Sequence, residues 1–274
     1  MGLTWRRVRE GVGGVPPGRY ASDAVDQHAA AWCGACYLVA AAQMVQDRAH
    51  VALARAAGAR VRPPPRVSLQ ALMDHFHERD AGPGWNACHG GFPEHVLQCL
   101  AEGTCPLVME RRDVARWWGF PRLTTRCPRP DAPFRVSEPR RVMPWDVRAA
   151  LADGPVVLEV SATTLKRLDA RGVARDLTPR EPDHAVCVVG WETRVDGVEC
   201  WIVRNSWGRA RVPKTIPTDV DDCVARGRNA CAVAWEPWTG DPRDPGFLLL
   251  PTSYAPLHAL APSPWLVATV TPRS

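Results

Sequence analysis

Residues 33–58 read CGACYLVAAAQMVQDRAHVALARAAG and carry the strongest structural signal in the chain. Apolar residues recur at the period of a helix, so we expect a helix from Cys36 to about Ala57, with Gly58 as its stop. Cys36 would then stand at the N-terminus of that helix. Unpaired N–H groups and the positive end of the helix dipole stabilise a thiolate there. The pattern therefore makes Cys36 a candidate nucleophile.

Three interpretations of these cysteines stay open at this point. Taken alone, Cys36 would most often be a buried structural cysteine. A C-x-x-C motif directly before a helix is also the geometry of a thiol–disulfide oxidoreductase. A zinc ion would suit the set Cys33, Cys36, Cys88 and His89.

The composition excludes several classes of protein. The chain has 274 residues, enough for one large or two small domains, and its 46% hydrophobic content excludes a wholly disordered chain. No apolar run approaches the ~20 residues of a membrane-spanning helix, and residues 1–30 show no signal peptide. The net charge is +5, but the arginines are scattered among acids, so we expect no nucleic-acid surface.

The cysteine count leaves the compartment open. Ten cysteines, an even number, favour disulfides and an oxidising compartment. The missing signal peptide and the absence of an Asn-x-Ser/Thr sequon argue the other way.

The chain changes character near its middle. Further helices are expected over residues 69–76, 93–101 and 145–152. Residues 119–144 are rich in Pro and Arg, as in a linker. β-branched runs then predict strands over residues 155–160, 184–189 and 198–203. Helices first and strands later predict an α+β fold in two lobes.

The strand half supplies two partners for Cys36. His184 opens one predicted strand, and Asn205 follows the next, within Asn205-Ser-Trp-Gly208. Residues at the start of one strand and the end of its neighbour can meet at one edge of a sheet. A thiol nucleophile needs a base, and that base needs a group to orient its other nitrogen.

These motifs resemble the papain-like cysteine peptidases. The matching pieces are Gln27…Cys33-Gly-Ala-Cys36-Tyr37, Cys88-His-Gly-Gly-Phe-Pro93, Asp183-His184-Ala-Val and Trp201-Ile-Val-Arg-Asn-Ser-Trp-Gly208. The resemblance implies a two-lobed fold with the active site in the cleft between the lobes. It covers a peptidase domain over residues 1–242, with a helical lobe at about 27–125 and a β lobe at about 126–242 that includes the N-terminal segment. Residues 243–274 would be a Pro-rich C-terminal extension.

The resemblance also assigns roles to residues. Cys36 is the nucleophile, His184 its partner, Asn205 the orienting group, and Gln27 completes the oxyanion hole. Trp207 shields the His–Asn hydrogen bond. Gly90 and Gly91 let a peptide backbone approach, and Phe92 and Pro93 line the pocket for the substrate residue two positions before the cut.

A short insertion narrows the resemblance to one branch of the family. Gln27 lies nine residues before Cys36, and the extra loop begins with His28-Ala-Ala-Ala. This loop is similar to the mini-loop of the cathepsin X (cathepsin Z) carboxypeptidases. The similarity implies removal of single residues from peptide C-termini, with a protonated His28 binding the terminal carboxylate below about pH 6.5.

The sequence also departs from the family pattern. Tyr37 stands in place of the usual Trp, and the stretch after Gly208 is rebuilt. His75 replaces an expected helix cysteine, so one family disulfide is lost. No inhibitory propeptide is recognisable before the match, which begins near Trp5.

The resemblance pairs Cys33 with Cys88 and leaves Cys36 as a thiol. Cys187 and Cys200 lie on predicted buried strands, where we expect thiols. Two further candidate pairs are Cys105 with Cys127 and Cys223 with Cys231.

The interpretation is therefore a papain-like cysteine carboxypeptidase without a metal or organic cofactor. Its partners would be peptides or proteins with a free C-terminus, without nucleic acid or a membrane span, and the chain would be a monomer. A lysosomal, secreted or virion-like compartment is suggested by the family. The alternative is a catalytically silent, tail-blocked binding protein on the same fold. The apolar tail would either guard the cleft or, as the simpler expectation, pack Phe247–Leu250 on the β lobe.

Overall fold

The computed structural model describes residues 2–28, 33–64, 66–79, 87–105, 109–110, 134–208, 211–213, 235–237, 245–258 and 262–273. Helices and an antiparallel sheet form an α+β fold, as the sequence predicts. None of the helices in this part of the chain is long and apolar enough to cross a membrane.

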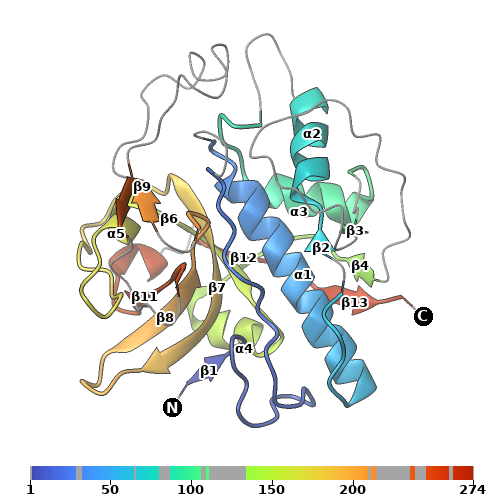
Figure 1. Ribbon diagram of the computed structural model, residues 1–274, viewed down its shortest axis with the longest axis horizontal. Helices are drawn as coiled ribbons and strands as arrows, with labels where there is room; N and C mark the ends of the chain where they lie inside the picture. The colour runs from blue at the N-terminus through green and yellow to red at the C-terminus, as the bar shows by residue number, and fades with distance from the viewer. Residues whose placement is uncertain are drawn as a thin grey trace.

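The helix α1 is the central element of the fold. It runs over Cys36–Ala57, and Gly58 ends it in the left-handed conformation with a φ of 56°. Both bounds match the expectation from local periodicity and the glycine stop. Most of its side chains are buried, because α1 lies between the sheet on one side and the helices α2 and α3 on the other (Figure 1).

Two shorter helices complete the helical side. The helix α2 spans Leu69–Arg79, and Ser68 caps it, since the Ser68 Oγ accepts a hydrogen bond from the Ala71 N–H at 3.2 Å. The helix α3 spans Pro93–Glu102, with Pro93 in its first turn and Gly103 at its C-cap. A two-stranded pair, β2 (Arg66–Val67) and β3 (Met109–Glu110), lies beside them.

A large antiparallel sheet forms the other side, in the order β11-β8-β7-β6-β12-β5, with β1 paired to β7. Its strands are β1 (Leu3–Thr4), β5 (Arg140–Val142), β6 (Val156–Val160), β7 (His184–Thr193), β8 (Glu199–Arg204), β11 (Phe247–Pro251) and β12 (Trp265–Val267). The predicted strands over residues 155–160, 184–189 and 198–203 correspond to β6, β7 and β8.

Smaller elements surround this framework. Two further strand pairs join β4 (Phe134–Val136) to β13 (Val270–Pro272) and β9 (Arg211–Pro213) to β10 (Trp235–Pro237). The helical turns are η1 (Pro144–Asp146), α4 (Val147–Ala152), α5 (Ala162–Lys166) and η2 (Ala255–His258). The region interpreted as a linker thus contains the strands β4 and β5 at its C-terminal end, because their pairing partners come from the far end of the chain.

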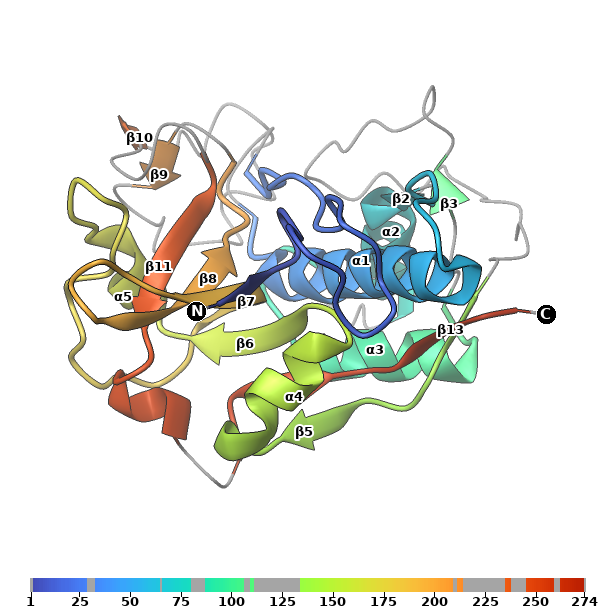
Figure 2. The same ribbon diagram turned by 90° about the horizontal axis from the view of Figure 1, so that it is seen from below.

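The described part of the segment after residue 242 is built into the fold rather than attached to it. The strand β11 pairs with β8, and β12 lies between β6 and β5. The strand β13 then continues to the helical side and contacts α1 (Figure 2). Phe247–Leu250 therefore packs on the β lobe, which was the simpler of the two expectations.

The sheet is buried on both faces. One face packs against α1 and contributes Val157, Ala185 and Cys187 to a first hydrophobic core. The other face contributes Leu158, Val186 and similar residues to a second core. This alternation follows from the two-residue period of a strand, and it places neighbouring residues of β6 on opposite faces.

Candidate active site

A pocket opens where the N-terminus of α1 meets the sheet. Nine residues expected at the site line it: Gln27, His28, Cys36, Gly90, Gly91, Phe92, Pro93, His184 and Trp207. The structure adds further lining residues: Gly34, His89, Glu159, Ala162, Pro182, Asp183 and Ala185. Asn205 is buried directly behind the pocket.

Cys36 is the first residue of α1 and carries a thiol. Burial raises the pKa of this thiol to about 11, although hydrogen bonds from backbone N–H groups, including that of Ala185, act in the opposite direction. The position at a helix N-terminus agrees with the sequence interpretation. The raised pKa indicates, however, that burial destabilises an isolated Cys36 thiolate more than the helix N-terminus stabilises it.

His184 and Asn205 form a buried hydrogen bond. The His184 Nε2 lies 2.8 Å from the Asn205 Oδ1. Because an amide oxygen only accepts hydrogen bonds, Nε2 carries the ring proton and Nδ1 has the lone pair. Asn205 thus sets the tautomer in which His184 can act as a base through Nδ1. Burial lowers the pKa of His184 to about 4, whereas the hydrogen bond to Asn205 raises it.

The raised pKa of Cys36 and the lowered pKa of His184 both disfavour one charged group alone in this pocket. A proton moved from Cys36 to His184 would create a thiolate and an imidazolium together, and two opposite charges in one site stabilise each other. A single charge on either group is therefore disfavoured relative to the pair of opposite charges.

Trp207 covers the His–Asn hydrogen bond. Its ring stacks on the His184 ring with a centroid separation of 4.9 Å and an interplanar angle of 26°. Trp207 is itself buried, so water is kept from the hydrogen bond between His184 and Asn205.

Gln27 is held rigidly at the edge of the pocket. Its Nε2 donates to the Cys33 carbonyl at 2.8 Å, and its Oε1 accepts a hydrogen bond from the Ser206 hydroxyl. The backbone N–H of Gln27 also donates to the Ser206 carbonyl at 2.8 Å. An amide nitrogen carries two hydrogens, so a second N–H at Nε2 remains for a further acceptor.

Gly90 and Gly91 are required as glycines for different structural reasons. Gly90 has a φ of 103°, and a Cβ there would meet nothing within 4 Å, so the backbone requires glycine although the space is open. At Gly91 a Cβ would lie 2.7 Å from the Tyr37 ring. Tyr37 in turn donates to the Ala87 carbonyl at 3.2 Å, so the residue that replaces the usual Trp fills the space beside Gly91.

Phe92 and Pro93 line the pocket in different ways. Phe92 is 60% exposed, whereas Pro93 is buried at the start of α3. A side chain bound between them would contact an exposed aromatic ring on one side and a fixed wall on the other.

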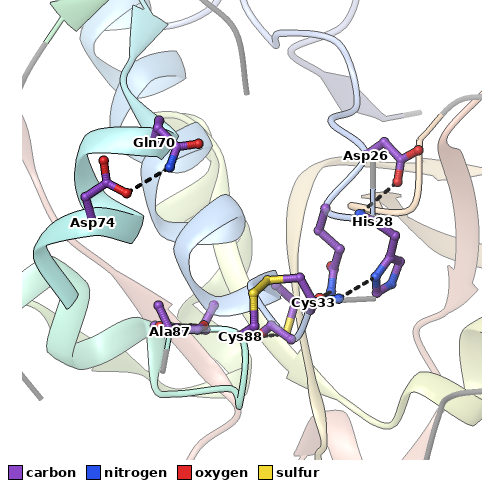
Figure 3. Close-up of a disulfide and its surroundings, with 11 residues drawn as sticks. Asp26, His28, Cys33, Gln70, Asp74, Ala87 and Cys88 are labelled. Atoms are coloured by element: carbon purple, nitrogen blue, oxygen red, sulfur yellow. Dashed lines mark hydrogen bonds between the residues drawn. A yellow bond between two sulfur atoms is a disulfide. The ribbon is translucent and has the colours of Figure 1, made fainter. Parts of the chain in front are cut away.

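His28 is buried, and its ring points toward Cys33 (Figure 3). The His28 Nδ1 accepts a hydrogen bond from the Cys33 N–H at 3.1 Å. A backbone N–H is always the donor, so the ring proton is on Nε2 and the imidazole is neutral. Protonation of His28 would place a proton on Nδ1 and break this hydrogen bond, so binding of a carboxylate by a protonated His28 stays a prediction. The loop residues 29–32 lie outside the described residues.

A disulfide joins Cys33 to Cys88, with a Cα–Cα distance of 4.4 Å (Figure 3). It ties the start of α1 to the loop that carries Gly90 and Gly91, and closure of such a loop contributes about 4 kcal/mol on the entropic account. Because Cys33 is bonded to Cys88, the C-x-x-C motif forms no redox pair with Cys36. No group of metal-ligating side chains is found among the described residues, so the zinc interpretation has no support there either.

The remaining cysteines follow the predictions in part. Cys187 and Cys200 are buried thiols, as expected. Cys105 is a thiol that hydrogen-bonds with Cys99, and its expected partner Cys127 lies outside the described residues. The end of α3 brings Cys99 and Cys105 together through local backbone geometry. Cys127, Cys223 and Cys231 lie outside the described residues.

Sequence reasoning did not place Glu159 in the pocket. Glu159 interrupts the apolar run of β6, where its neighbours are buried valine and leucine. A carboxylate within a buried strand is an available sequence signal, because such groups are rarely placed there without a partner.

Comparison with known proteins gives the family. The model of the papain family cysteine proteases matches residues 19–213, and the chain belongs to this family. Cysteine proteinase 2 of Entamoeba histolytica is 26% identical over 227 residues, covering 76% of this chain and 62% of that protein. Cathepsin Z of Onchocerca volvulus is 27% identical over 217 residues, covering 74% and 64%. The chain thus spans roughly three fifths of the length of these curated relatives.

Solved structures agree on the fold. The proform of the ragweed pollen allergen Amb a 11, a cysteine protease, aligns with a TM-score of 0.64 at 16% identity, covering 100% of this chain and 66% of the other. The bromelain protease of Ananas comosus aligns with a TM-score of 0.56 at 16% identity, covering 99% and 97%. At this identity the likeness defines a papain-like two-lobed fold.

Proposed function

We propose that this papain-family chain is a cysteine peptidase with the triad Cys36, His184 and Asn205, and that it acts as a carboxypeptidase. The observation that carries the triad is the buried Nε2–Oδ1 hydrogen bond of 2.8 Å between His184 and Asn205. It directs the basic Nδ1 of a pocket-lining histidine away from Asn205, while Cys36 lines the same pocket.

The reaction begins with transfer of the Cys36 proton to the His184 Nδ1. The thiolate attacks the scissile carbonyl carbon, and the oxyanion is stabilised by the Gln27 side-chain amide and the Cys36 backbone N–H. Each such donor contributes roughly 3 kcal/mol to the transition state. His184 then protonates the leaving amine. Water attacks the acyl-enzyme with His184 as the base, which releases the acid product and restores the thiol.

Carboxypeptidase action rests on His28. It follows Gln27 directly and lines the cleft, so the terminal carboxylate of a substrate can reach its ring. The neutral tautomer offers the Nε2 proton as a single donor. A hydrogen bond to a charged acceptor contributes about 1.5–3 kcal/mol, roughly ten- to a hundred-fold in selectivity.

The test is mass spectrometry of a peptide library after incubation with the protein and with Cys36→Ala. Loss of single C-terminal residues, absent with Cys36→Ala, supports the proposal. The wild type should cleave amidated peptides much more slowly than peptides with a free C-terminal carboxylate. This difference should be much smaller in His28→Ala. If His28→Ala keeps the full preference for free carboxylates, the carboxypeptidase assignment is wrong even where the triad is confirmed.

A catalytically silent binding protein is the second candidate, because burial disfavours the Cys36 thiolate unless His184 is protonated with it, and the thiolate is the nucleophile. A peptide carrying a thiol-reactive epoxide separates the two. Labelling of Cys36 that depends on His184 identifies an enzyme, whereas reversible binding without labelling identifies a binder.

A further inference from the structure

The cleft carries negative charge beside β6. Glu159 and Asp183 both line it, and no lysine or arginine among the described residues does. Arg141 contacts Glu159 and Lys166 interacts electrostatically with Asp183, but both cations lie outside the lining. A cleft lined by carboxylates rather than by cations favours a positively charged ligand, since charges interact more strongly there than in bulk water.

The position of Glu159 follows from the pleat of β6. Leu158 and Val160 belong to the second core, so Glu159 faces the opposite side of the sheet together with Val157. Its direct partner on β7 is Ala185, whose N–H hydrogen-bonds to the thiol of Cys36. Glu159 thus lines the same cleft as Cys36.

One arginine holds two carboxylates at this wall. The Arg141 Nη1 contacts the Glu159 carboxylate, and its Nη2 lies 2.7 Å from the Glu94 Oε2 on α3. Arg141 itself does not line the cleft. Two carboxylates share one guanidinium, so the cluster keeps a net negative charge, and the Glu159 side chain, 18% exposed, presents it to the pocket.

We propose that the pocket between Phe92, Pro93 and Glu159 selects a substrate residue with a cationic side chain, arginine or lysine. The inference rests on the proposed peptidase function and names its substrate class. The exposed Phe92 ring covers the aliphatic stem of such a residue, while Glu159 accepts hydrogen bonds from its charged end. An acidic side chain at the same place would be repelled.

The test compares peptides that differ only at the residue two positions before the cut, with Arg, Met or Glu there. The wild type should prefer Arg over Met and Met over Glu. Glu159→Gln should lower the Arg-to-Met ratio of kcat/KM about tenfold, in line with a charge-assisted hydrogen bond. The matched control is Glu94→Gln, which removes one negative charge from the same cluster but outside the cleft, so the ratio should fall less than in Glu159→Gln.

An unchanged ratio in Glu159→Gln, or an equal loss in Glu94→Gln, would overturn the inference. Calorimetry of the same peptides binding to Cys36→Ala distinguishes a failure of the charge selection from a failure of the proposed peptidase function. A preference for Arg that depends on Glu159 in this variant supports the charge selection even if no peptide is cleaved. Equal binding of all three peptides contradicts the selection, even if the enzyme is active.

A second observation, at the far end of α3, stands independently of the cleft. The Cys99 Sγ lies 3.2 Å from the Thr104 Oγ1 and 3.5 Å from the His75 Nε2, and it hydrogen-bonds with the thiol of Cys105. The N–H groups of Thr104 and Cys105 both donate to the Cys99 carbonyl, at 3.1 and 3.3 Å. The turn after α3 therefore folds Cys105 back onto Cys99.

These contacts favour the charged form of Cys99. Its pKa is lowered to about 5, chiefly by the hydrogen bond from Cys105, with Thr104 and His75 adding to the effect against burial, since Cys99 is 5% exposed. Cys200, by contrast, has its pKa raised to about 11 by burial. The attacking species in thiol–disulfide exchange is the thiolate, so Cys99 should react where Cys200 does not.

We propose that Cys99 and Cys105 form a reversible disulfide by exchange with a low-molecular-weight disulfide. The Cys99 thiolate attacks one sulfur of the oxidant and displaces one thiolate, giving a mixed disulfide. The Cys105 sulfur then attacks the Cys99 sulfur and releases the second thiol. The protein loses two electrons and two protons, and the oxidant takes them up as two thiols. The bond would join α3 to its following turn, beside the His75 that replaces an expected cysteine.

The experiment treats the reduced protein with oxidised glutathione, then unfolds it, blocks thiols by alkylation and maps peptides by mass. Cys99 and Cys105 should be joined, with the mass of two hydrogens lost, while Cys200 is alkylated in full. Cys105→Ser should retain glutathione on Cys99, and His75→Ala should slow the reaction. Alkylated Cys99 in the wild type, or a glutathione adduct that persists there, would overturn the proposal.

Discussion

A buried ion pair ties together the three segments that carry Cys36, Asn205 and Gln27, and its removal is the most informative perturbation of this fold. The Arg204 Nη1 lies 2.6 Å from the Asp47 Oδ2, and the two side chains are 0% and 1% exposed. Arg204 directly precedes Asn205, and Asp47 belongs to α1, which begins at Cys36.

Ser22 connects this pair to the segment that leads to Gln27. The Arg204 Nη1 donates to the Ser22 carbonyl at 3.0 Å and to its Oγ at 2.9 Å. The Ser22 N–H donates to the Asp47 Oδ1 at 3.0 Å. The network thus fixes α1, β8 and the N-terminal segment relative to one another.

Removing one partner leaves an uncompensated charge in the core. Arg204→Met or Asp47→Leu should each lower the free energy of unfolding by about 3–5 kcal/mol. The double variant leaves no buried charge, so it should lose at least ~3 kcal/mol less than the sum of the two single losses. Catalytic activity should fall in the single variants, because the segments that carry Cys36 and Asn205 lose their common anchor.

The assay is urea unfolding at neutral pH with the disulfide intact, followed by tryptophan fluorescence. Arg48 provides the matched control, since this buried arginine donates to the carbonyls of Pro155 and Ala150 at 2.7 Å and not to Asp47. The cycle of Arg48→Met with Asp47→Leu should show a coupling near zero. A coupling under about 1 kcal/mol for Arg204 and Asp47 would refute the reasoning.

Three further predictions follow from the site and its support. The native pKa of His184 is about 4 against an ordinary value of 6.5, so between these pH values the unfolded chain binds a proton that the native state does not. The free energy of unfolding should therefore fall by about 3 kcal/mol as pH drops through this window. Urea unfolding of His184→Asn at a series of pH values should lack this part of the dependence of the unfolding free energy on pH. Gly91→Ala should lower the Tm, because its Cβ would lie 2.7 Å from the Tyr37 ring. Adding Tyr37→Leu to this variant should recover part of the loss. Equal Tm values for the wild type and Gly91→Ala would contradict the clash. Deletion after Pro242 should abolish cooperative unfolding rather than raise activity, because it removes β12 from between β6 and β5; a truncated chain with the wild-type Tm would disprove this.

Local signals in the sequence were sufficient for the helical side. The period of the apolar residues and the glycine stop predicted α1 from Cys36 to Ala57, and Ser68 and Pro93 marked the starts of α2 and α3. Helix ends depend on hydrogen bonds within one turn of the chain, so a few adjacent residues determine them. The motif around His184 and Asn205 was equally readable, because both lie at the ends of strands that are neighbours in sequence and in space.

Contacts between distant residues were decided only by the tertiary structure. The sequence set residues 243–274 apart, yet β12 and β13 take partners more than a hundred residues away. The neutral tautomer of His28 depends on the N–H of Cys33, and the charge at Glu159 depends on an arginine from β5 and a second glutamate from α3. The amino-acid sequence by itself determined the helices and the residue types proposed for the triad, whereas the pairing of Cys33 with Cys88 was predicted from the resemblance to the papain-like peptidases. The partners of buried polar groups came from the packing of the whole chain, because a carboxylate or an imidazole buried in the core takes the nearest complementary group in space.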